Sequence, residues 1–442
     1  RINLSWSKSS LVVNSPIQAN EIRLATKDSD LAQDRITDWL FISFPYDLKV
    51  NEIDAEGNLF VVRYYDGEKR ALEGPTSSWK QLGKDETMRA NQGYIFKTNA
   101  SSNRSAASFN TDVSSMSALF NRSAVTIPLQ KHESVAMPDA NWNLIGNPFP
   151  CYFRTKSLFE EGGLDGTITV WDSNIQNYQY YTQDDDAYIE PLTAFFVQHN
   201  QATSVTFHPE GRAAKLPEGT TRSASALRSG DGRQVLNLVL SNDSLSDKTR
   251  IVFNEAAKAG YELGLDASKF RSMNPNAPAF YSIDADNQQL AINERPWDNG
   301  VVRLGCNFGV KGEYSIALQE AVEQDLILVD KVTGAQTNLK EQAYRFSAEV
   351  GESNDRFELR SGNPTGMEEM AGFQWQVRGG QLFLTGLPTN ARVIVHDTMG
   401  RTVCDRTVSD ELSGLALPQA GVYYLTIRTQ QATRTERIMV KE

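Results

Sequence analysis

Alternation of apolar and polar residues at a period of two runs along nearly the whole chain, and it constrains the fold more than any other feature. Clear examples are residues 234–240, 392–396 and 422–428, which are short runs bounded by Gly, Asn, Asp or Pro. Helical periodicity is scarce and is confined to residues 155–162, residues 254–260 and, more weakly, residues 111–121. Strands at this density, without helices between them, predict β-sandwiches rather than βαβ units.

Length and charge narrow the class of protein further. A chain of 442 residues is too long for one ordinary core, and at about 150 residues per domain it predicts roughly three domains. The net charge of −11 argues against nucleic acid, which needs a basic face, and against electrostatic attachment to anionic lipid. No apolar stretch reaches the roughly 18 residues that cross a bilayer, so no transmembrane segment is predicted.

Cysteine usage and the start of the chain add two smaller expectations. Cys151, Cys306 and Cys404 are far apart and odd in number, so we expect small buried hydrophobic residues rather than a disulfide framework. The chain begins at Arg1 in a strand-like stretch with no signal peptide, which is typical of a processed or truncated terminus.

An internal duplication divides the first half of the chain. Residues 38–46 (DWLFISFPY) resemble residues 141–149 (NWNLIGNPF), which begin 103 residues later. The apolar-aromatic segment that begins at Gln92 resembles the one that begins at Thr193, 101 residues later. Landmarks in the same order at a nearly constant offset predict a duplicated β region over residues 1–210, with similar units at about 1–108 and 109–210.

Shifts in composition mark two further boundaries. Residues 211–233 are rich in Gly, Ser, Ala and Arg and predict a linker or an exposed loop. Residues 362–371 predict a second linker, since they combine Pro, Gly and acidic residues. The expected order is therefore an all-β chain of tandem β-sandwich or jelly-roll-like units, a middle β-sandwich at 234–361, and an Ig-like C-terminal β-sandwich at 372–442.

The last seventy or so residues carry a more specific pattern. Residues 393–401 read VIVHDTMGR, residues 415–428 read LALPQAGVYYLTIR, and residues 435–441 read TERIMVK. This order resembles the type A C-terminal sorting domain of cargo proteins of the type IX (Por) secretion system of Bacteroidota. That family shows D-x-x-G-[RK], then L-P-x-G-x-Y-x-L-x-I, then a short terminal strand ending in a basic residue. The matching positions are Asp397, Gly400, Arg401, Pro418, Gly421, Tyr423, Leu425, Ile427 and Lys441.

Local physical chemistry agrees with these motif positions. We expect Asp397 to Arg401 to form a hairpin turn in which Gly400 takes a positive φ. Tyr423, Leu425 and Ile427 alternate and should share one face of a strand. A plain Ig-like sandwich without a sorting role would show the same features, because the sorting domain is itself such a sandwich. Segments further upstream, such as residues 143–150, resemble β modules found beside these tails.

The resemblance implies a location and a set of partners. The C-terminal domain would direct the protein through an outer-membrane shuttle barrel of the type IX machinery. A sortase-like transpeptidase would then cut within residues 361–371 and attach the protein to a lipopolysaccharide anchor. The implied localisation is secreted and on the outer-membrane cell surface.

No catalytic motif is present: the sequence lacks GxSxG, HExxH, a Walker A element and a GxGxxG after a strand. No catalytic residue and no resident cofactor are therefore predicted. The acidic cluster of Asp184, Asp185 and Asp186 is a candidate calcium site, with a solvated loop as the alternative. Candidate glycan-stacking aromatics, which are otherwise core residues, are Trp79, Tyr178, Tyr180 and Trp297.

The sequence favours a non-enzymatic cell-surface protein used in adhesion or ligand binding, with an unknown host or glycan ligand. Two alternatives stay open. The chain can instead be the accessory β domains of a larger glycan-active or proteolytic exoenzyme whose catalytic part lies upstream of Arg1, or a carbohydrate-binding module.

Overall fold

The computed structural model describes the chain in thirteen segments, and every structural statement below concerns them. They are residues 2–5, 9–19, 21–25, 39–55, 59–98, 108–112, 120–173, 175–217, 233–297, 300–322, 324–361, 374–428 and 433–440. Contacts group the chain into two compact units. The larger comprises residues 1–320, 329–335 and 342–358, and the smaller comprises residues 321–328, 336–341 and 359–442.

Strands dominate both units, as the period-two pattern predicts, and the fold is all-β. The two α-helices are α1 (Gly67–Glu73) and α2 (Thr155–Glu160), and short 3-10 turns occur at Val50–Glu52, Pro75–Ser77, Met137–Asp139 and Pro209–Gly211. The helix expected at residues 155–162 is confirmed by α2. The helix expected at residues 254–260 is wrong: Asn254 Oδ1 accepts a hydrogen bond from Ala256 N at 3.0 Å, and such a side-chain contact favours a turn over a helix. Residues 113–119 of the third candidate lie outside the described residues.

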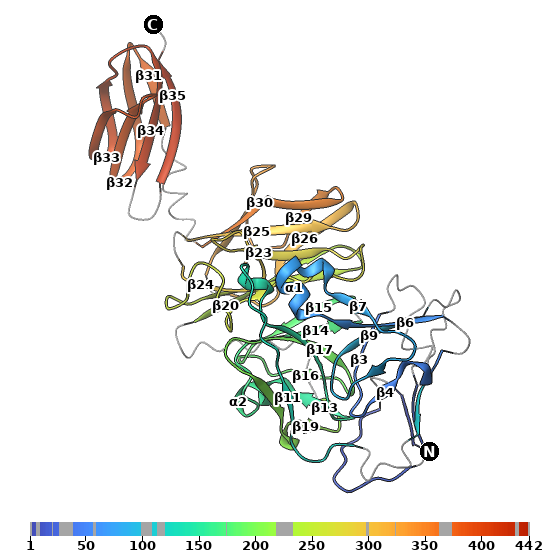
Figure 1. Ribbon diagram of the computed structural model, residues 1–442. Coiled ribbons are helices and arrows are strands. Elements are labelled where there is room, and N and C mark those ends of the chain that lie inside the picture. Colours follow the sequence, from blue (N-terminus) through green and yellow to red (C-terminus); the bar gives the residue numbers. More distant parts are fainter. Residues whose placement is uncertain are drawn as a thin grey trace. The chain divides into compact units, whose positions relative to one another are not determined.

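Each of the two predicted repeats contains a four-stranded sheet. In the first repeat the four main strands are β3 (Leu40–Ile42), β6 (Phe60–Tyr65), β7 (Trp79–Gln81) and β9 (Tyr94–Thr98), in the sheet order β3-β9-β6-β7. In the second they are β12 (Trp142–Gly146), β14 (Thr167–Asp172), β15 (Asn177–Tyr181) and β17 (Ala194–Gln198), in the order β12-β17-β14-β15. Both sheets therefore use the same strand order, and both lie within the larger unit (Figure 1).

The correspondence extends to the minor strands. The pair β4 (Leu48–Lys49) and β8 (Thr87–Met88) matches β13 (Tyr152–Arg154) and β16 (Tyr188–Ile189). The pair β2 (Glu21–Ala25) and β10 (Ser108–Asp112) matches β11 (Val125–Pro128) and β18 (Ser204–Phe207). Since β10 pairs with β2, the first repeat extends past the expected boundary at residue 108. The remaining strands of this region are β1 (Ile2–Ser5), β5 (Ile53–Asp54) and β19 (Arg212–Ala213).

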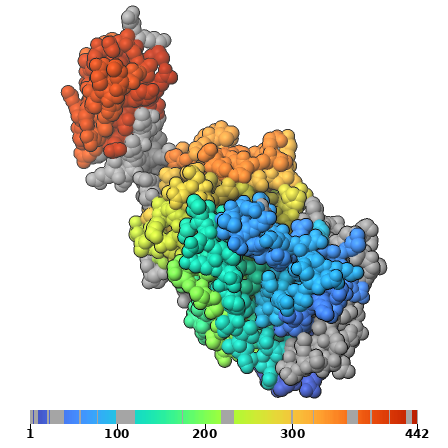
Figure 2. Space-filling model, in the orientation of Figure 1, coloured from blue at the N-terminus to red at the C-terminus, as the bar shows by residue number. Residues whose placement is uncertain are grey.

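The two repeats meet through a reciprocal set of backbone contacts. Ile42 bridges Thr193, and Ile145, the counterpart of Ile42, bridges Gln92, the counterpart of Thr193. Likewise, Ser43 N donates to Leu192 O at 3.0 Å, and Gly146 N donates to Asn91 O at 2.9 Å. Such an exchange of equivalent contacts is the pattern of a two-fold symmetric interface. Figure 2 shows the first repeat (blue) and the second (green) adjoining on the face in view.

The middle region adds a long, mainly antiparallel sheet, and most of its strands belong to the larger unit. Its strands are β20 (Gln234–Ser241), β21 (Ser246–Phe253), β22 (Ala267–Ser268), β23 (Ala279–Ile283), β24 (Gln289–Arg295), β25 (Val301–Phe308), β26 (Gly312–Leu318), β27 (Leu326–Asp330), β28 (Gln336–Asn338), β29 (Tyr344–Ala348) and β30 (Gly351–Ser361). The order β25-β23-β24-β21-β20-β26-β29 runs to one end of an 11-stranded sheet in which β21 and β24 pair in parallel.

One hydrophobic cluster joins the duplicated region to this middle region. It contains Phe41 and Trp142 from the repeats together with Val252, Phe270 and Ile292 from the middle region. The segment expected to separate two domains, residues 211–233, therefore does not separate two compact units, because apolar surface on both sides of it is buried in common.

The C-terminal strands build a core of their own. They are β31 (Gln374–Arg378), β32 (Gln381–Asp397), β33 (Thr402–Ala416), β34 (Gly421–Arg428) and β35 (Thr433–Val440), in the order β31-β32-β34-β35 with β33 on β32. Leu384, Val393, Leu425 and Ile438 are completely buried in it. Register shifts along the β32–β33 pair mark bulges, which let these two long strands bend around the core.

Candidate functional site

The turn between β32 and β33 holds the first sorting motif in a fixed geometry. Asp397 Oδ1 accepts hydrogen bonds from Met399 N at 2.9 Å and from Arg401 N at 3.0 Å, and Arg401 Nε donates to Asp397 Oδ2 at 2.7 Å. Gly400 has φ 78°, so the expected hairpin turn is confirmed. Desolvation alone would raise the pKa of Asp397, but the hydrogen bonds from Arg401 and Met399 outweigh it and hold that pKa below its usual value.

The second motif, at residues 415–428, includes the loop before β34 and the strand itself. The Tyr423 hydroxyl donates to Gln419 O at 2.9 Å and accepts from Gln419 N at 3.2 Å, tying the loop after the exposed Pro418 to the strand. Tyr423, Leu425 and Ile427 share the buried face of β34, as expected. Gly421 begins the strand with φ 154°. Lys441 and the expected cleavage segment, apart from Ser361, lie outside the described residues.

The three consecutive aspartates of the candidate calcium site bind three different arginines. Asp184 accepts from Arg233 at 2.7 Å, and Asp186 accepts from Arg154 at 2.6 and 2.5 Å. Asp185, only 1% exposed, accepts from Arg250 through both oxygens, at 2.7 and 2.8 Å. A calcium ion here would have to displace these guanidinium groups. No group of three or more His, Cys, Asp or Glu side chains suited to a metal occurs among the described residues.

Most of the candidate stacking aromatics are packed against other rings. Tyr178 and Tyr180 are each 4% exposed and belong to the shared core, so the expectation that they stack on a glycan is corrected: neither ring has an open face. Trp79 is half-buried and packs edge-on against Tyr65, with the two ring centroids 5.1 Å apart. Trp297 packs edge-on against Phe253, with ring centroids 3.6 Å apart. The four residues do not form one surface.

A groove that the sequence did not indicate, lined by both polar and apolar residues, lies at the junction of the two repeats. Its volume is about 500 Å³, and both repeats line it. The side chains with hydrogen-bonding groups on its walls include Tyr64, Glu68, Arg89, Gln92, His132 and Asn143. Burial lowers the pKa of His132, which favours the neutral imidazole. The residues on its walls come from segments far apart in sequence, so only the fold brings them together.

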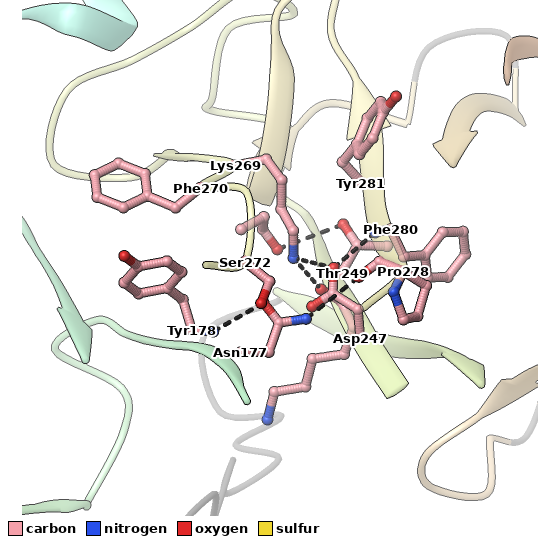
Figure 3. Close-up of polar contacts among 12 residues, drawn as sticks. Asn177, Tyr178, Asp247, Thr249, Lys269, Phe270, Ser272, Pro278, Phe280 and Tyr281 are labelled. Atoms are coloured by element: carbon pink, nitrogen blue, oxygen red, sulfur yellow. Dashed lines mark hydrogen bonds and ion pairs between the residues drawn. The ribbon is translucent and has the colours of Figure 1, made fainter. Parts of the chain in front are cut away.

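A second feature hidden from sequence analysis is a buried lysine–aspartate pair in the middle region (Figure 3). Lys269 Nζ lies 2.5 Å from Asp247 Oδ2, and the two side chains are 0% and 1% exposed. Phe280 N donates to the same Asp247 oxygen at 2.7 Å, and Lys269 Nζ donates to Lys248 O at 3.2 Å. Lys269 lies in a segment that is mostly polar (residues 266–273, DASKFRSM), so nothing in the sequence distinguishes this lysine from a surface residue.

The cysteines behave as expected. Cys151, Cys306 and Cys404 are buried and unpaired, and burial raises the pKa of the Cys151 thiol to about 11. No helix in the described part of the chain has both the length and the apolar character to cross a membrane.

Comparison with known proteins gives three findings. A family profile described as a domain of unknown function (DUF8693) matches residues 175–361, which span the end of the second repeat and the middle region. The search of curated proteins found no match. Among solved structures, PorZ, a surface component of the type IX secretion system of Porphyromonas gingivalis, is similar at 18% identity and a TM-score of 0.16. That alignment covers 20% of this chain and 14% of PorZ, so the chain spans a small part of that protein.

Proposed function

We propose that this chain is a non-enzymatic, secreted cell-surface protein whose C-terminal unit serves as a type IX sorting domain. The observation that carries the proposal is that the motif residues of the resemblance make specific contacts within one hydrophobic core. Arg401 binds Asp397 in the turn, and the Tyr423 hydroxyl binds the backbone of Gln419 in the loop before β34. Partners consistent with this role are the outer-membrane shuttle barrel, a sortase-like transpeptidase and a lipopolysaccharide anchor.

Surface delivery tests the proposal directly. The full protein is produced in a bacterium that has a type IX system, with the double variant Asp397→Ala/Arg401→Ala as the test. A matched control is Arg392→Ala/Asp405→Ala, which removes another bidentate pair from the same unit, with both contacts at 2.7 Å. We expect protease-accessible surface protein to fall at least about tenfold for the turn variant and to stay unchanged for the control. Equal surface levels for both would contradict a sorting role for the turn.

Peptide mapping of the mature material supplies a second readout. If a transpeptidase cuts within residues 361–371, surface-attached protein yields peptides from the larger unit and none from residues 380–440. Retention of those C-terminal peptides on surface-attached protein argues against cleavage.

The groove between the repeats supports ligand binding as the function of the larger unit at the cell surface. Its walls carry the amides of Gln92 and Asn143, a His132 whose lowered pKa favours the uncharged form, and the Tyr64 ring. Of its charged residues, Asp66 pairs with Lys80 and Arg89 pairs with Asp47 at 2.7 Å, while Glu68 adds a carboxylate that disfavours an anionic ligand. Neutral donors and acceptors beside an aromatic ring suit a neutral, polyhydroxylated ligand, so we propose a glycan.

A glycan array with the full chain tests this second step. The repeats share a core with the middle region, so an isolated 1–210 fragment would expose apolar surface and is a poor probe. We expect Gln92→Ala to weaken binding about tenfold, while Gln201→Ala, an exposed amide of the second repeat that does not line the groove, leaves it unchanged. Absence of binding to every glycan class removes the proposal.

A further inference from the structure

The Lys269–Asp247 pair differs from the other ion pairs in being closed off from water on both sides. Among the other lysine–carboxylate pairs of the described residues, such as Lys156–Glu160, the lysine is at least 16% exposed. Asp185 and Asp330 are as deeply buried as Asp247, but each faces an arginine. A guanidinium keeps its charge in proteins, whereas a lysine amine becomes a neutral nucleophile when it is desolvated.

Aromatic side chains shape the surroundings of the pair. Lys269 Nζ lies 5.1 Å from the centre of the Tyr180 ring. Phe270 follows Lys269 in the chain, and Phe280, on β23, donates its N–H to Asp247 (Figure 3). Tyr180 is fixed in turn, because its hydroxyl accepts from Phe270 N at 2.9 Å. The amine is therefore held against the carboxyl group by packing from several strands.

Burial favours the uncharged form of both partners. Desolvation raises the pKa of Asp247, although Lys269 opposes the shift, and desolvation lowers the pKa of Lys269, although Asp247 opposes that one. Moving one proton from the ammonium to the carboxylate converts the ion pair into an amine beside a carboxylic acid. These are the species that can condense, and a site of low polarity favours them over the charged pair.

We propose that Lys269 and Asp247 join in an intramolecular amide, a covalent crosslink between β21 and the segment that follows β22. Lys269 Nζ attacks Asp247 Cγ and a C–N bond forms. The bond between Cγ and the hydroxyl oxygen of the carboxylic acid then breaks. That hydroxyl leaves as water with one proton from the amine. The balance needs no oxidant, metal or cofactor.

Two backbone groups are placed to assist this step. Phe280 N–H donates to Asp247 Oδ2 and would stabilise negative charge on that oxygen in the tetrahedral intermediate. The Lys248 carbonyl accepts a hydrogen bond from Lys269 Nζ and so orients the amine. The contact of 2.5 Å across the pair holds the reacting groups together, which is the arrangement that lowers the barrier of an intramolecular reaction.

The mass of the purified full chain under denaturing conditions tests the proposal without relying on the folding of any variant. We expect the wild-type protein to be one water lighter than its sequence, and a digest to yield a branched peptide that contains both Lys269 and Asp247. A wild-type mass equal to that of the sequence, with both residues recovered in separate linear peptides, overturns the proposal.

Variants assign the bond to its two residues. Lys269→Arg keeps the charge but cannot condense, so its mass should equal that of its full sequence. Lys156→Arg, at the lysine that pairs with Glu160, is the matched control and should still lose one water. Asp247→Asn should form the same amide by losing ammonia and reach the same mass as the crosslinked wild type. Loss of water in Lys269→Arg would place the modification elsewhere and overturn the assignment.

Discussion

Gly146 and Ser43 occupy equivalent positions in the two repeats, and the backbone of one lies against the side chain of the other. A Cβ built on Gly146 would lie 1.7 Å from Ser43 Oγ and 2.1 Å from Ser43 Cβ. Only glycine fits at this point of the junction, because any side chain would have to displace the other repeat. The sequence comparison aligns the two residues but gives no indication that they touch.

Gly146→Ala should therefore destabilise the larger unit by about 1–3 kcal/mol through overpacking. Gly312→Ala is the control, because a Cβ there meets nothing within 4 Å. Adding Ser43→Gly to Gly146→Ala should recover most of the loss. Chemical denaturation of the four proteins measures the effect, and equal stabilities for Gly146→Ala and Gly312→Ala would contradict the close contact.

Asp266 is a buried acid that makes stability depend on pH. It is 1% exposed and accepts from Glu262 N at 2.6 Å and Glu294 N at 2.7 Å. Burial nevertheless raises the pKa of Asp266 to about 8, from 3.8. Between pH 3.8 and about 8, Asp266 stays protonated in the folded protein but is ionised in the unfolded chain. The contribution of Asp266 to stability is therefore full below pH 3.8 and declines as the pH rises to about 8.

Asp266→Asn removes this ionisation and should flatten the decline. While Asp266 alone titrates, stability falls by up to about 1.4 kcal/mol per pH unit. The measurement is the free energy of unfolding of wild type and variant from about pH 5 to about pH 8, with the difference between the two curves assigned to Asp266. Parallel curves would show that Asp266 does not titrate in this interval.

At the scale of elements, the turn between β15 and β16 ties the second repeat to the middle strands. Asp185 reaches Arg250 on β21, and Asp184 reaches Arg233, which also donates to Glu294 on β24 at 3.0 Å. Asp186 instead binds Arg154 within its own repeat. The sequence shows three identical neighbours, but their environments differ because the turn directs each side chain toward a different element.

Asp185→Asn should cost about 3–5 kcal/mol of stability, since it removes the carboxylate that binds the buried Arg250 through both oxygens. Asp186→Asn should cost at most about 1 kcal/mol, because Arg154 and Asp186 are 39% and 46% exposed. Thermal denaturation compares the two variants with the wild type. Equal losses for both would contradict this ranking, and a stabilisation of the wild type by added calcium would show that the ion can displace the arginines.

How far sequence predicts an element depends on how local its causes are. The Asp397 turn and the buried face of Tyr423, Leu425 and Ile427 were predictable, because the contacts that fix them lie within a few residues or follow from strand alternation. The packing of Tyr178 was not, since its partner Phe270 comes from a segment about 90 residues further along the chain. For the same reason, the pairing of Lys269 with Asp247 could not be predicted.

At the scale of the molecule, the duplicated region and the middle region depend on one core. Arg70 illustrates the join: it is 4% exposed, its guanidinium lies 4.9 Å from the Trp142 ring and 4.7 Å from the Phe270 ring, and it donates to Ser268 Oγ at 3.4 Å. These contacts link α1 of the first repeat, the second repeat and the middle region. The linker-like composition of residues 211–233 gave no sign of this shared burial.

Cutting the chain between the two regions should therefore leave them associated. A protease site placed within residues 218–232 and cleaved in the folded protein should give two fragments that co-elute on size exclusion and separate only in denaturant. Elution of two independently folded fragments would contradict the shared core. An uncut protein carrying the same inserted site is the control.

The reciprocal contacts between the repeats resemble those between the two subunits of a symmetric dimer. Each repeat forms the same backbone contacts with the other, as the two subunits of a homodimer do. Here the two halves are held together by one chain instead of by association. Asn91 and Leu192, equivalent residues at this junction, both adopt positive φ, at 65° and 55°, as two subunits with one backbone would. Gly146 opposite Ser43 marks where this equivalence has been lost. Two copies of the first half would place a serine at both positions, and the two side chains would then collide at the junction.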